Sequence, residues 1–374
     1  MKRISIQPRQ NWEEKIQDVG FLYYKDYYNE QNAYTFSLDE INKIEKATNE
    51  IFDLCIRTVD FIVEENLLQD FKIPSQYHEI IKKSWKEDHI SFYGRFDLGY
   101  NSNTQEIKLL EFNADTPTSL VEASIVQWFW LQDFNDTYDQ FNSIHDRLVA
   151  HMKTCHPYLL GKQKVFFSSV SDSQEDYITT KYLEDCAHQA GILTSYLPIH
   201  EISLGDGSFC TPQGEMIENI FKLYPYEWMF HEEFGEALIS NFDFCTWIEP
   251  FYKSIMSNKM FMVYLSRLFP DSPYILKCQT DPEGLINYVK KPLLSREGAN
   301  IEIIKNGMSI EKTEGDYGEE GFVYQDYFEL PVFDGQTPIL GSWLIGGEAA
   351  GLGIRESSTL ITTNTSRFVP HFII

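Results

Sequence analysis

"GRFDLGYNSNTQEIKLLEFNADTPTS", residues 94–119, contains two strand-like segments joined by a polar turn and followed by a second polar run. The flanking text "HISFYGRFDLGY" and "EIKLLEFN" is rich in apolar and aromatic residues, which predicts a β-hairpin. If the five residues "NSNTQ" (101–105) close this hairpin, Tyr100 pairs with Glu106. That pairing decides which side chains share a face.

Four polar side chains are predicted to share one face of this hairpin. Side chains alternate along a strand, so Arg95 and Asp97 point the same way, as do Glu111 and Asn113. The two carboxylates and the amide oxygen are hard ligands suited to Mg²⁺, whereas Arg95 suits phosphate oxygens. The alternative is a solvent-exposed hairpin face with a cross-strand ion pair.

The polar run after the hairpin leads into a predicted helix. The text "SLVEASIVQWFWLQDF" (119–134) has helical spacing, and Ser119 with Glu122 predicts a capping box. Helix N-termini hold anions through free backbone N–H groups and the helix dipole. A substrate carboxylate or a phosphate would therefore fit beside the proposed metal, which favours a ligand site over an exposed face.

Composition narrows the class of protein. A chain of 374 residues with 43% hydrophobic residues is expected to form two or three lobes around a cleft. The formal net charge of −25 argues against binding to nucleic acid or to an acidic membrane. It favours a cationic partner such as an amine, although acidity also serves solubility alone.

Targeting and metal-binding motifs are missing from the sequence. The six cysteines are scattered without a CxxC pair, which indicates neither a zinc ribbon nor a disulfide framework. The start "MKRISIQPRQNWEEK" lacks an apolar signal core, and no stretch is apolar enough to span a membrane. We expect a cytoplasmic protein. GxSxG and HExxH are also absent, so neither a serine nucleophile nor a zinc peptidase is indicated.

The remaining elements predict a mixed α/β fold. Residues 37–68 have helical spacing with Ser37 and Glu40 as a capping box. Residues 164–199 read as strand, helix and strand, a βαβ unit with Gly191 as the helix stop. A third lobe of strands and glycine-bearing loops is expected to begin near residue 250.

The C-terminal lobe carries two glycine-containing segments but no P-loop and no GxGxxG. In "YVKKPLLSREGANIEI" (288–303) a loop with Gly298 could cover a triphosphate while Lys291 and Arg296 neutralise it, or it could be a plain hairpin. "GGEAAGLGIRES" (346–357) is predicted to be a mobile loop that presents Arg355 to a transferring phosphate, or else a packed glycine-rich loop.

Several separated motifs, in this order, carry a family resemblance: "GRFDLGY", "KLLEFNADTPTSLVEA", "SNK", "VKKPLLSREGAN" and "GGEAAGLGIRES". The chain resembles the synthetase domain of glutathionylspermidine synthetase over nearly its whole length, and most of all its single-domain acid–amine ligase relatives. The resemblance implies an ATP-grasp fold similar to that of glutathione synthetase. It divides the chain into a helical region with the metal-binding hairpin (1–160), a pre-ATP-grasp-like α/β lobe (161–250) and a nucleotide-binding lobe (251–374), without an amidase domain.

The resemblance also implies a role for individual residues. It implies that Asp97, Glu111 and Asn113 bind Mg²⁺, that Arg95 binds phosphate and the substrate carboxylate, and that Lys259 and Lys291, in preference to Lys290, bind the nucleotide. Glu297 and Gly298 would lie in the loop that covers the phosphates, and the adenine hinge would be Gln325, Asp326, Tyr327 and Phe328, with Leu360, Ile361 and Thr362 as a second nucleotide contact. Arg355 would be the transition-state arginine, and the peptide pocket would be lined by Thr116, Thr118, Glu227 and Arg296.

The activity implied is an ATP- and Mg²⁺-dependent acid–amine ligase that works through an acyl phosphate. Its substrates would be a small-molecule or peptide carboxylate and an amine, a class that includes polyamines. The related bifunctional enzymes have serines and a cysteine after the metal-binding Asn, where this chain has Thr116, Thr118 and Ser119, so glutathione and spermidine are not carried over. The alternatives are a ligase that modifies a peptide or protein terminus and a nucleotide-binding protein that has lost ligation.

Overall fold

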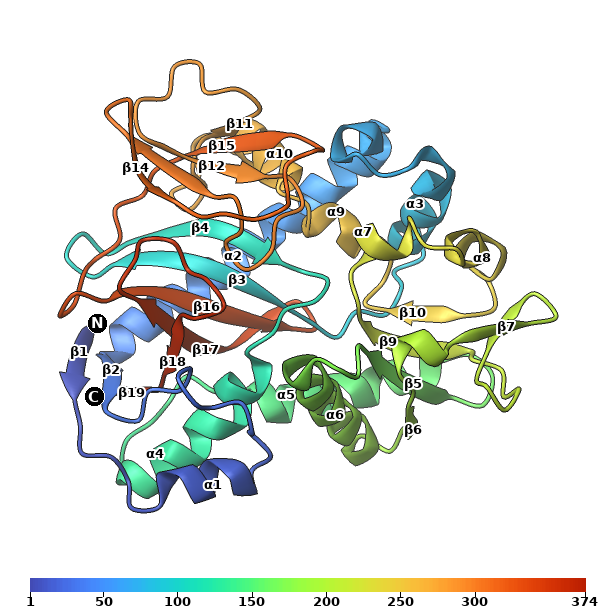
Figure 1. Ribbon diagram of the computed structural model, residues 1–374, viewed down its shortest axis with the longest axis horizontal. Coiled ribbons are helices and arrows are strands. Elements are labelled where there is room, and N and C mark those ends of the chain that lie inside the picture. Colours follow the sequence, from blue (N-terminus) through green and yellow to red (C-terminus); the bar gives the residue numbers. More distant parts are fainter.

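The termini of the chain meet in one small sheet. The computed structural model describes residues 1–374 and shows N and C side by side (Figure 1). Strand β1 (Lys2–Ser5) runs antiparallel to β2 (Asn32–Phe36), and β19 (His371–Ile373) runs parallel to β2. Helix α1 (Trp12–Asp18) lies between the first two strands in sequence.

The predicted hairpin forms one edge of a five-stranded sheet. Strands β3 (Tyr93–Asn101) and β4 (Glu106–Asn113) confirm the hairpin, and the sheet order is β18-β17-β16-β3-β4. The other members come from the end of the chain: β16 (Thr337–Ile345), β17 (Glu348–Ser357) and β18 (Arg367–Val369). The mobile loop predicted for 346–357 was wrong, because Gly346 and Gly347 form the turn after β16 and residues 348–357 form the long, mostly buried strand β17.

Helix α2 (Leu38–Glu64) packs on this sheet. Its predicted capping box is confirmed, since Ser37 accepts from the backbone N–H of Glu40 and the Glu40 side chain accepts from the N–H of Ser37. Its apolar stripe, which includes Ile44 and Ile51, is fully buried. Short turns of 3₁₀ helix and α3 (His78–Lys86) connect α2 to β3.

A parallel sheet forms the second part of the molecule, at the right of Figure 1. The predicted βαβ unit is confirmed as β5 (Lys164–Ser169), α6 (Gln174–Gln189) and β6 (Leu193–Tyr196), with Gly191 at φ 85° after the helix. Strands β9 (Asn219–Leu223) and β10 (Thr246–Ile248) complete the order β10-β9-β5-β6. Nearby elements are α5 (Ile144–Cys155), β7 (Ser203–Gly205), β8 (Ser208–Cys210), α7 (Tyr226–Met229) and α8 (Gly235–Ser240).

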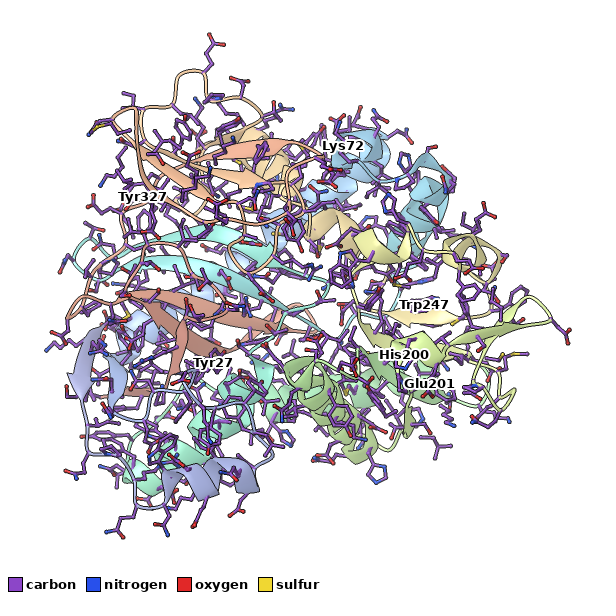
Figure 2. All side chains as sticks on the ribbon, viewed as in Figure 1. Tyr27, Lys72, His200, Glu201, Trp247 and Tyr327 are labelled. Atoms are coloured by element: carbon purple, nitrogen blue, oxygen red, sulfur yellow. The ribbon has the colours of Figure 1, made fainter.

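An antiparallel sheet stands above the β3–β4 hairpin in Figure 1. Its order is β11-β15-β12-β13-β14, and α9 (Lys253–Met256) and α10 (Met260–Leu268) precede it in the chain. The strands are β11 (Cys278–Gln279), β12 (Tyr288–Pro292), β13 (Glu302–Lys305), β14 (Met308–Lys312) and β15 (Phe322–Asp326). Tyr327, just after β15, lies between this sheet and the hairpin (Figure 2).

One core holds these parts together. A cluster of 54 buried apolar residues includes side chains of α2, β3, β4, α10, β15 and β16, so the walls of any cleft between the sheets share that core. Strands β16 to β18 follow residue 336 in the chain but belong to the same sheet as β3. The predicted lobe boundaries at residues 160 and 250 stay predictions. None of the helices has the length and apolar character required to traverse a lipid bilayer.

Candidate active site

The turn of the hairpin differs from the sequence prediction. Asn101 pairs with Glu106 and Tyr100 with Ile107, so the predicted pairing of Tyr100 with Glu106 was wrong. The closing turn therefore contains residues 102–105 rather than 101–105. A one-residue change in register moves every side chain of a strand to the other face. If the register at the turn continued along both strands, Arg95 and Asp97 would lie on the opposite face from Glu111 and Asn113.

A β-bulge restores the common face. The register shifts just after Asp97, so that Asp97 lies opposite Glu111 and Arg95 lies opposite Asn113. The extra residue is Leu110, which has no partner in β3. Bulges re-aim side chains in this way, often next to active sites. All four side chains consequently line one cavity.

Arg95 is held rigidly at the base of this cavity. Its Nε lies 2.7 Å from Oδ1 of Asp97 and its Nη1 donates to the carbonyl of Thr118 at 2.5 Å. Its guanidinium also lies 5.7 Å from the ring centre of Trp343. Burial alone would raise the pKa of Asp97, but the adjacent Arg95 charge brings that pKa below its ordinary value. Asp97 is therefore a carboxylate at neutral pH.

Two buried lysines contact the end of β4. Lys259 Nζ lies 2.9 Å from Oε1 of Glu111 and donates to the carbonyl of Ser295 at 2.6 Å. Lys291 Nζ donates to the carbonyl of Leu110 at 2.9 Å and to Oε1 of Gln325 at 2.7 Å. The bulge thus leaves a backbone carbonyl for Lys291. Burial lowers the pKa of Lys291, with Glu111 opposing that shift.

Lys290 points elsewhere. Its Nζ lies 4.1 Å from the ring centre of Phe322, and the residue is not among those that line the cavity. Alternation along β12 separates the two neighbouring lysines, so only Lys291 reaches the cavity.

The far end of the cavity is apolar. Ile301, Ile303 and Ile361 form a small buried cluster against which Val289 and Tyr327 pack. The four residues from Gln325 to Phe328, predicted to form the hinge beside adenine, lie along this end. Leu360, Ile361 and Thr362 face it from the other side. An apolar wall that includes Tyr327 suits a planar heterocycle.

The loop between β12 and β13 approaches the chain near Thr362 very closely. Gly298 has φ 71°, and a Cβ at this position would lie 2.3 Å from the carbonyl oxygen of Thr362. Only glycine fits both the left-handed backbone and this contact. Glu297 beside it also has a positive φ of 53°. The loop therefore packs its backbone at Gly298 directly against the segment that contains Thr362 at the edge of the cavity.

Arg296 from the same loop reaches into a polar corner. Its Nε and Nη2 lie 3.0 and 2.7 Å from Oε1 of Glu227, and its Nη1 donates to Oγ1 of Thr116 at 2.7 Å. Thr118 lines the same region. A guanidinium paired with a carboxylate can bind both ends of an amino-acid group, because each partner offers a charge of opposite sign.

A buried ion pair supports this corner. Lys222 Nζ is bonded to Oδ1 of Asp115, and both side chains are at most 1% exposed. Oδ2 of Asp115 accepts from the backbone N–H of Tyr226 at 3.1 Å. Burial raises the pKa of Asp115 and lowers that of Lys222, while their mutual attraction opposes both shifts. The pair fixes the backbone next to Thr116.

Arg355 lies in β17, two strands from Arg95, and lines the cavity. Its guanidinium forms no hydrogen bond or ion pair with another side chain, unlike that of Arg95 or Arg296. Its charge helps to lower the pKa of Asp97. A cation without a protein partner in such a place is available to an anionic ligand.

Three carboxylates were missed by sequence reasoning: the fully buried Glu122 and the half-buried Glu175 and Asp176, here called the acidic chamber. Burial, and then the charge of Glu175, raises the pKa of Glu122 to about 7. Burial likewise raises the pKa of Glu175, with Thr118 and Arg355 opposing, and raises that of Asp176 to about 6. The acidic chamber therefore adjoins the cavity beside Thr118 and Arg355, and Asp176 lines the cavity itself.

The predicted capping box at Ser119 was wrong, which is why the chamber was missed. Ser119 has φ 64° and makes no cap, and its Oγ lies 2.8 Å from the hydroxyl of Tyr27, near β18 (Figure 2). Residues 122–126 form a π-helical turn before α4 (Gln127–Asn135). Glu122 faces inward, with the Tyr23 hydroxyl 3.3 Å from its Oε1 and no partner for its Oε2.

A single cavity of about 300 Å³ collects the predicted residues. Every predicted site residue lines it except Lys259, which reaches it through Glu111. These residues come from five stretches that lie far apart in the chain, namely 95–118, 227, 259, 291–298 and 325–362. Residues so placed by the fold, and not by chain proximity, define a ligand cleft between two sheets.

The fold and the cleft together define an α/β protein of the glutathione-synthetase-like ATP-grasp class. A glutathione synthetase-like effector of Globodera pallida superposes with a TM-score of 0.58 over 99% of this chain and 98% of its own, at 11% sequence identity. At this identity the likeness concerns the fold alone.

The chain belongs to the family described as "Glutathionylspermidine synthase preATP-grasp", whose model matches residues 3–374. A Haemophilus influenzae protein named "Putative acid--amine ligase" is 37% identical over 100% of both chains. Trypanothione synthetase of Crithidia fasciculata is 26% identical, and bifunctional glutathionylspermidine synthetase/amidase of Escherichia coli is 24% identical. This chain spans 52% and 59% of the lengths of these two relatives. The protein is an ATP-dependent C–N ligase.

Proposed function

We propose that the protein joins a carboxylate to an amine through an acyl phosphate, with ATP as phosphoryl donor and Mg²⁺ as cofactor. The observation that carries this proposal is the convergence of Asp97, Glu111 and Asn113 with Lys291 and Arg355 around one cavity. Oxygen ligands for a hard cation and separate cations for phosphate are the two requirements of phosphoryl transfer.

The residues present fit a magnesium ion bound together with phosphate. No group of three or more His, Cys, Asp or Glu side chains is placed to hold a metal alone. Asp97, Glu111 and Asn113 offer two carboxylates and one amide, and the Nδ2 of Asn113 is buried without a partner. Mg²⁺ commonly takes its other ligands from substrate phosphates and water. When bound, it would supply positive charge to the phosphate oxygens.

The first step activates the carboxylate. A carboxylate oxygen of the substrate attacks the γ-phosphorus, the bond from that phosphorus to the β–γ bridging oxygen breaks, and ADP leaves. Arg95 holds the carboxylate, and Arg355, which has no protein partner, neutralises charge on the transferring group. The buried hydroxyls of Ser257 and Ser295 line the same cavity without partners and can donate to phosphate.

The second step forms the amide. The amine nitrogen attacks the acyl carbon, the bond from that carbon to the phosphate oxygen breaks, and inorganic phosphate leaves. The acidic chamber beside Arg355 suits an ammonium ion, because the fully buried Glu122 and the half-buried Glu175 have no cation bonded to them. Their raised pKa values also suit them to take up the proton that the amine must lose.

The carboxyl substrate is expected to carry both charges of an amino-acid group. Arg296 and Glu227 form the corner that would receive it, and Arg296 also donates to Thr116. An amino-acid or peptide carboxylate fits this corner better than a simple fatty acid, since a fatty acid would leave Glu227 unpaired.

The proposal is tested with purified protein, ATP and Mg²⁺ against a panel of amino-acid or peptide carboxylates and amines. ADP and phosphate release, together with product mass, is expected only when both partners are present. Asp97→Ala and Arg355→Ala should abolish turnover while circular dichroism shows that both variants keep the native fold. Near-normal turnover in both variants, or release of AMP and pyrophosphate, would overturn the proposal.

A further inference from the structure

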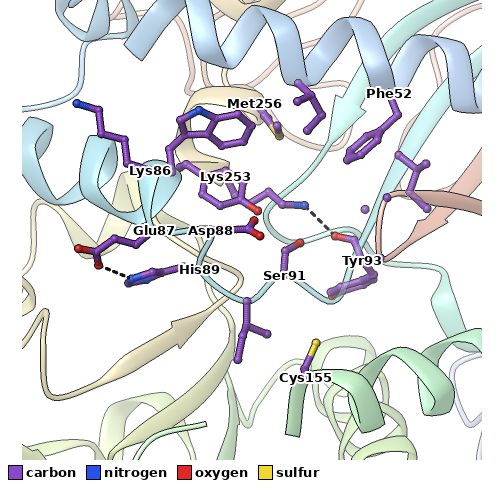
Figure 3. Close-up of a pocket in the computed structure, with 18 of the residues that line it drawn as sticks. Phe52, Lys86, Glu87, Asp88, His89, Ser91, Tyr93, Cys155, Lys253 and Met256 are labelled. Carbon is purple, nitrogen blue, oxygen red and sulfur yellow. Dashed lines mark hydrogen bonds and ion pairs between the residues drawn. The ribbon is translucent and has the colours of Figure 1, made fainter. Parts of the chain in front are cut away.

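The ligand cleft and a larger cavity elsewhere in the protein are bounded by different kinds of backbone. The larger cavity, of about 1260 Å³, is enclosed mostly by residues of helices and strands, among them α2, α5 and α9 (Figure 3). Its buried Lys253 donates to the carbonyl of Tyr93 at 3.1 Å and lies 3.4 Å from Glu249. The apolar end of the ligand cleft is instead closed on one side by residues 358–366, which form neither helix nor strand. The backbone N–H groups of such a segment need partners from elsewhere in the fold.

Glu311 on β14 supplies two of those partners. Its Oε2 accepts from the backbone N–H of Leu360 at 3.0 Å, and its Oε1 accepts from the backbone N–H of Ile361 at 2.9 Å. Both oxygens of one carboxylate are thus used on two consecutive N–H groups. Hydrogen bonds to a charged acceptor are about twice as strong as bonds between neutral groups. The two bonds therefore hold the segment at residues that line the cleft.

The register of the sheet places Glu311 on the side of the cleft. Glu311 lies opposite Ile303 of β13, and directly opposed residues of an antiparallel pair share a face of the sheet. Ile303 itself lines the cleft. Strand β14 is the edge strand of its sheet, whereas residues 358–366 connect β17 to β18 in the other sheet (Figure 1). The bonds of Glu311 therefore join the two sheets that enclose the cleft.

The glycine loop between β12 and β13 is held from the same place. Thr313 follows Glu311 by two residues, and its Oγ1 donates to the carbonyl of Gly298 at 2.5 Å. The same Oγ1 accepts from the backbone N–H of Ile301 at 3.0 Å. Gly298 in turn packs against Thr362, as described above. Both loops at this end of the cleft are therefore attached to residues 311–313.

The segment contributes one side of the apolar end. Ile361 is 4% exposed and packs with Ile301 and Ile303, and Leu360 packs against the same cluster. A ligand that uses this end of the cleft needs that side in place. If the segment were free to move, the ligand would have to order it on binding and would lose affinity.

We propose that Glu311 is a positioning residue for the nucleotide, which holds residues 360–362 as a preformed wall of the cleft. Glu311 does not itself line the cleft. The inference rests on the proposed function, because it takes the cleft to be the ATP site. As a negative charge alone, Glu311 would repel the phosphates of ATP. Its removal would therefore strengthen nucleotide binding through charge and weaken it through loss of the wall, so the two roles have opposite signs.

The test measures calorimetric binding of a non-hydrolysable ATP analogue with Mg²⁺ to wild type and three variants. Glu311→Ala is expected to bind the analogue about tenfold more weakly than wild type. Glu311→Gln keeps the shape of the side chain and one acceptor oxygen, so its affinity should fall between these two. Glu314→Ala removes an equal charge from a nearby exposed side chain and should bind no more weakly than wild type.

Amide hydrogen exchange at Leu360 and Ile361 reports the contact itself, without a ligand. Exchange at both amides should be faster in Glu311→Ala than in wild type and unchanged in Glu314→Ala. The inference is overturned if Glu311→Ala binds the analogue as tightly as wild type or more tightly, or if exchange at the two amides does not change. If wild type itself binds no analogue, the assignment of the cleft to ATP is wrong and the inference fails with it.

These measurements do not require turnover, which separates them from the test of the ligase. Weaker binding by Glu311→Ala, together with no ADP release for any pair of substrates, would support the positioning role and overturn the ligase proposal. Equal binding by wild type and Glu311→Ala, together with turnover by wild type, would support the ligase proposal and overturn the positioning role.

Discussion

Glu122 offers a sharp test of the acidic chamber, because its protonation is linked to the stability of the whole protein. The side chain is fully buried, and one of its carboxylate oxygens has no hydrogen-bond partner. Replacement by Gln keeps the shape of the side chain and removes the titrating group. The difference between wild type and Glu122→Gln therefore isolates the contribution of this one carboxyl group.

The magnitude follows from the pKa. Burial and the charge of Glu175 raise the pKa of Glu122 from its ordinary value of 4.5 to about 7 in the folded protein. A shift of this size corresponds to about 3 kcal/mol. Because the folded pKa lies above the unfolded one, the folded state binds the proton more tightly. The stabilising contribution is present below pH 4.5 and is lost as pH rises through about 7.

The assay is urea unfolding of both proteins from about pH 5 to about pH 8.5. The free energy of unfolding of wild type, relative to Glu122→Gln, is expected to fall by about 2 to 3 kcal/mol across this range, because part of the total change lies below pH 5. Glu175→Gln should lower the pKa of Glu122 and move the fall to lower pH. Parallel pH profiles for wild type and Glu122→Gln would refute the reasoning.

Three further changes test individual parts of the cleft. Lys291→Met is expected to weaken calorimetric binding of an ATP analogue by about 100-fold, while the matched Lys290→Met binds normally; equal losses would contradict the placement of Lys291. Gly298→Ala should raise the KM for ATP about tenfold, because its Cβ would meet the carbonyl of Thr362, and an unchanged KM would count against loop closure. Lys222→Met leaves Asp115 buried and unpaired, so urea unfolding should show a loss of about 3 to 5 kcal/mol, and a loss below about 1 kcal/mol would argue against the pair.

Local sequence patterns were enough to predict those elements that are stabilised by contacts among their own residues. The capping box at Ser37 and the apolar stripe of α2 depend on side chains three or four positions apart, and both are present. The βαβ unit has the same character, since Gly191 ends α6 through its own backbone conformation. The hairpin was also predicted, because alternation and the polar turn are local features.

Features set by distant contacts were not predictable in the same way. Ser119 has the sequence spacing of a capping box with Glu122, yet its hydroxyl bonds to Tyr27, a residue 92 positions earlier. The bulge at Leu110 leaves a carbonyl that Lys291 binds, 181 positions later. Strand β17 was taken for a loop because its glycines look flexible, but neighbouring strands on both sides hold it in the sheet. Tertiary packing decided each of these cases.

The acidic chamber shows the same limit for function. Glu175 and Asp176 stand in the first turn of α6, where carboxylates commonly stabilise a helix N-terminus. Because this local role already explains the two carboxylates, the sequence gives no sign that they lie near Glu122 and Arg355. The fold brings these residues together. Strand alternation marked the four polar residues of the hairpin, and the family resemblance added the hinge, the second nucleotide contact and the peptide pocket. The roles of all these residues stay predictions.

The most direct measurement follows the oxygen atoms of the carboxyl substrate. The carboxylate is labelled with a heavy oxygen isotope and incubated with the protein, ATP, Mg²⁺ and the amine that supports turnover. Attack of the carboxylate on the γ-phosphorus predicts that one labelled oxygen appears in the released inorganic phosphate for each amide formed. Amide formation with unlabelled phosphate would contradict the acyl-phosphate mechanism.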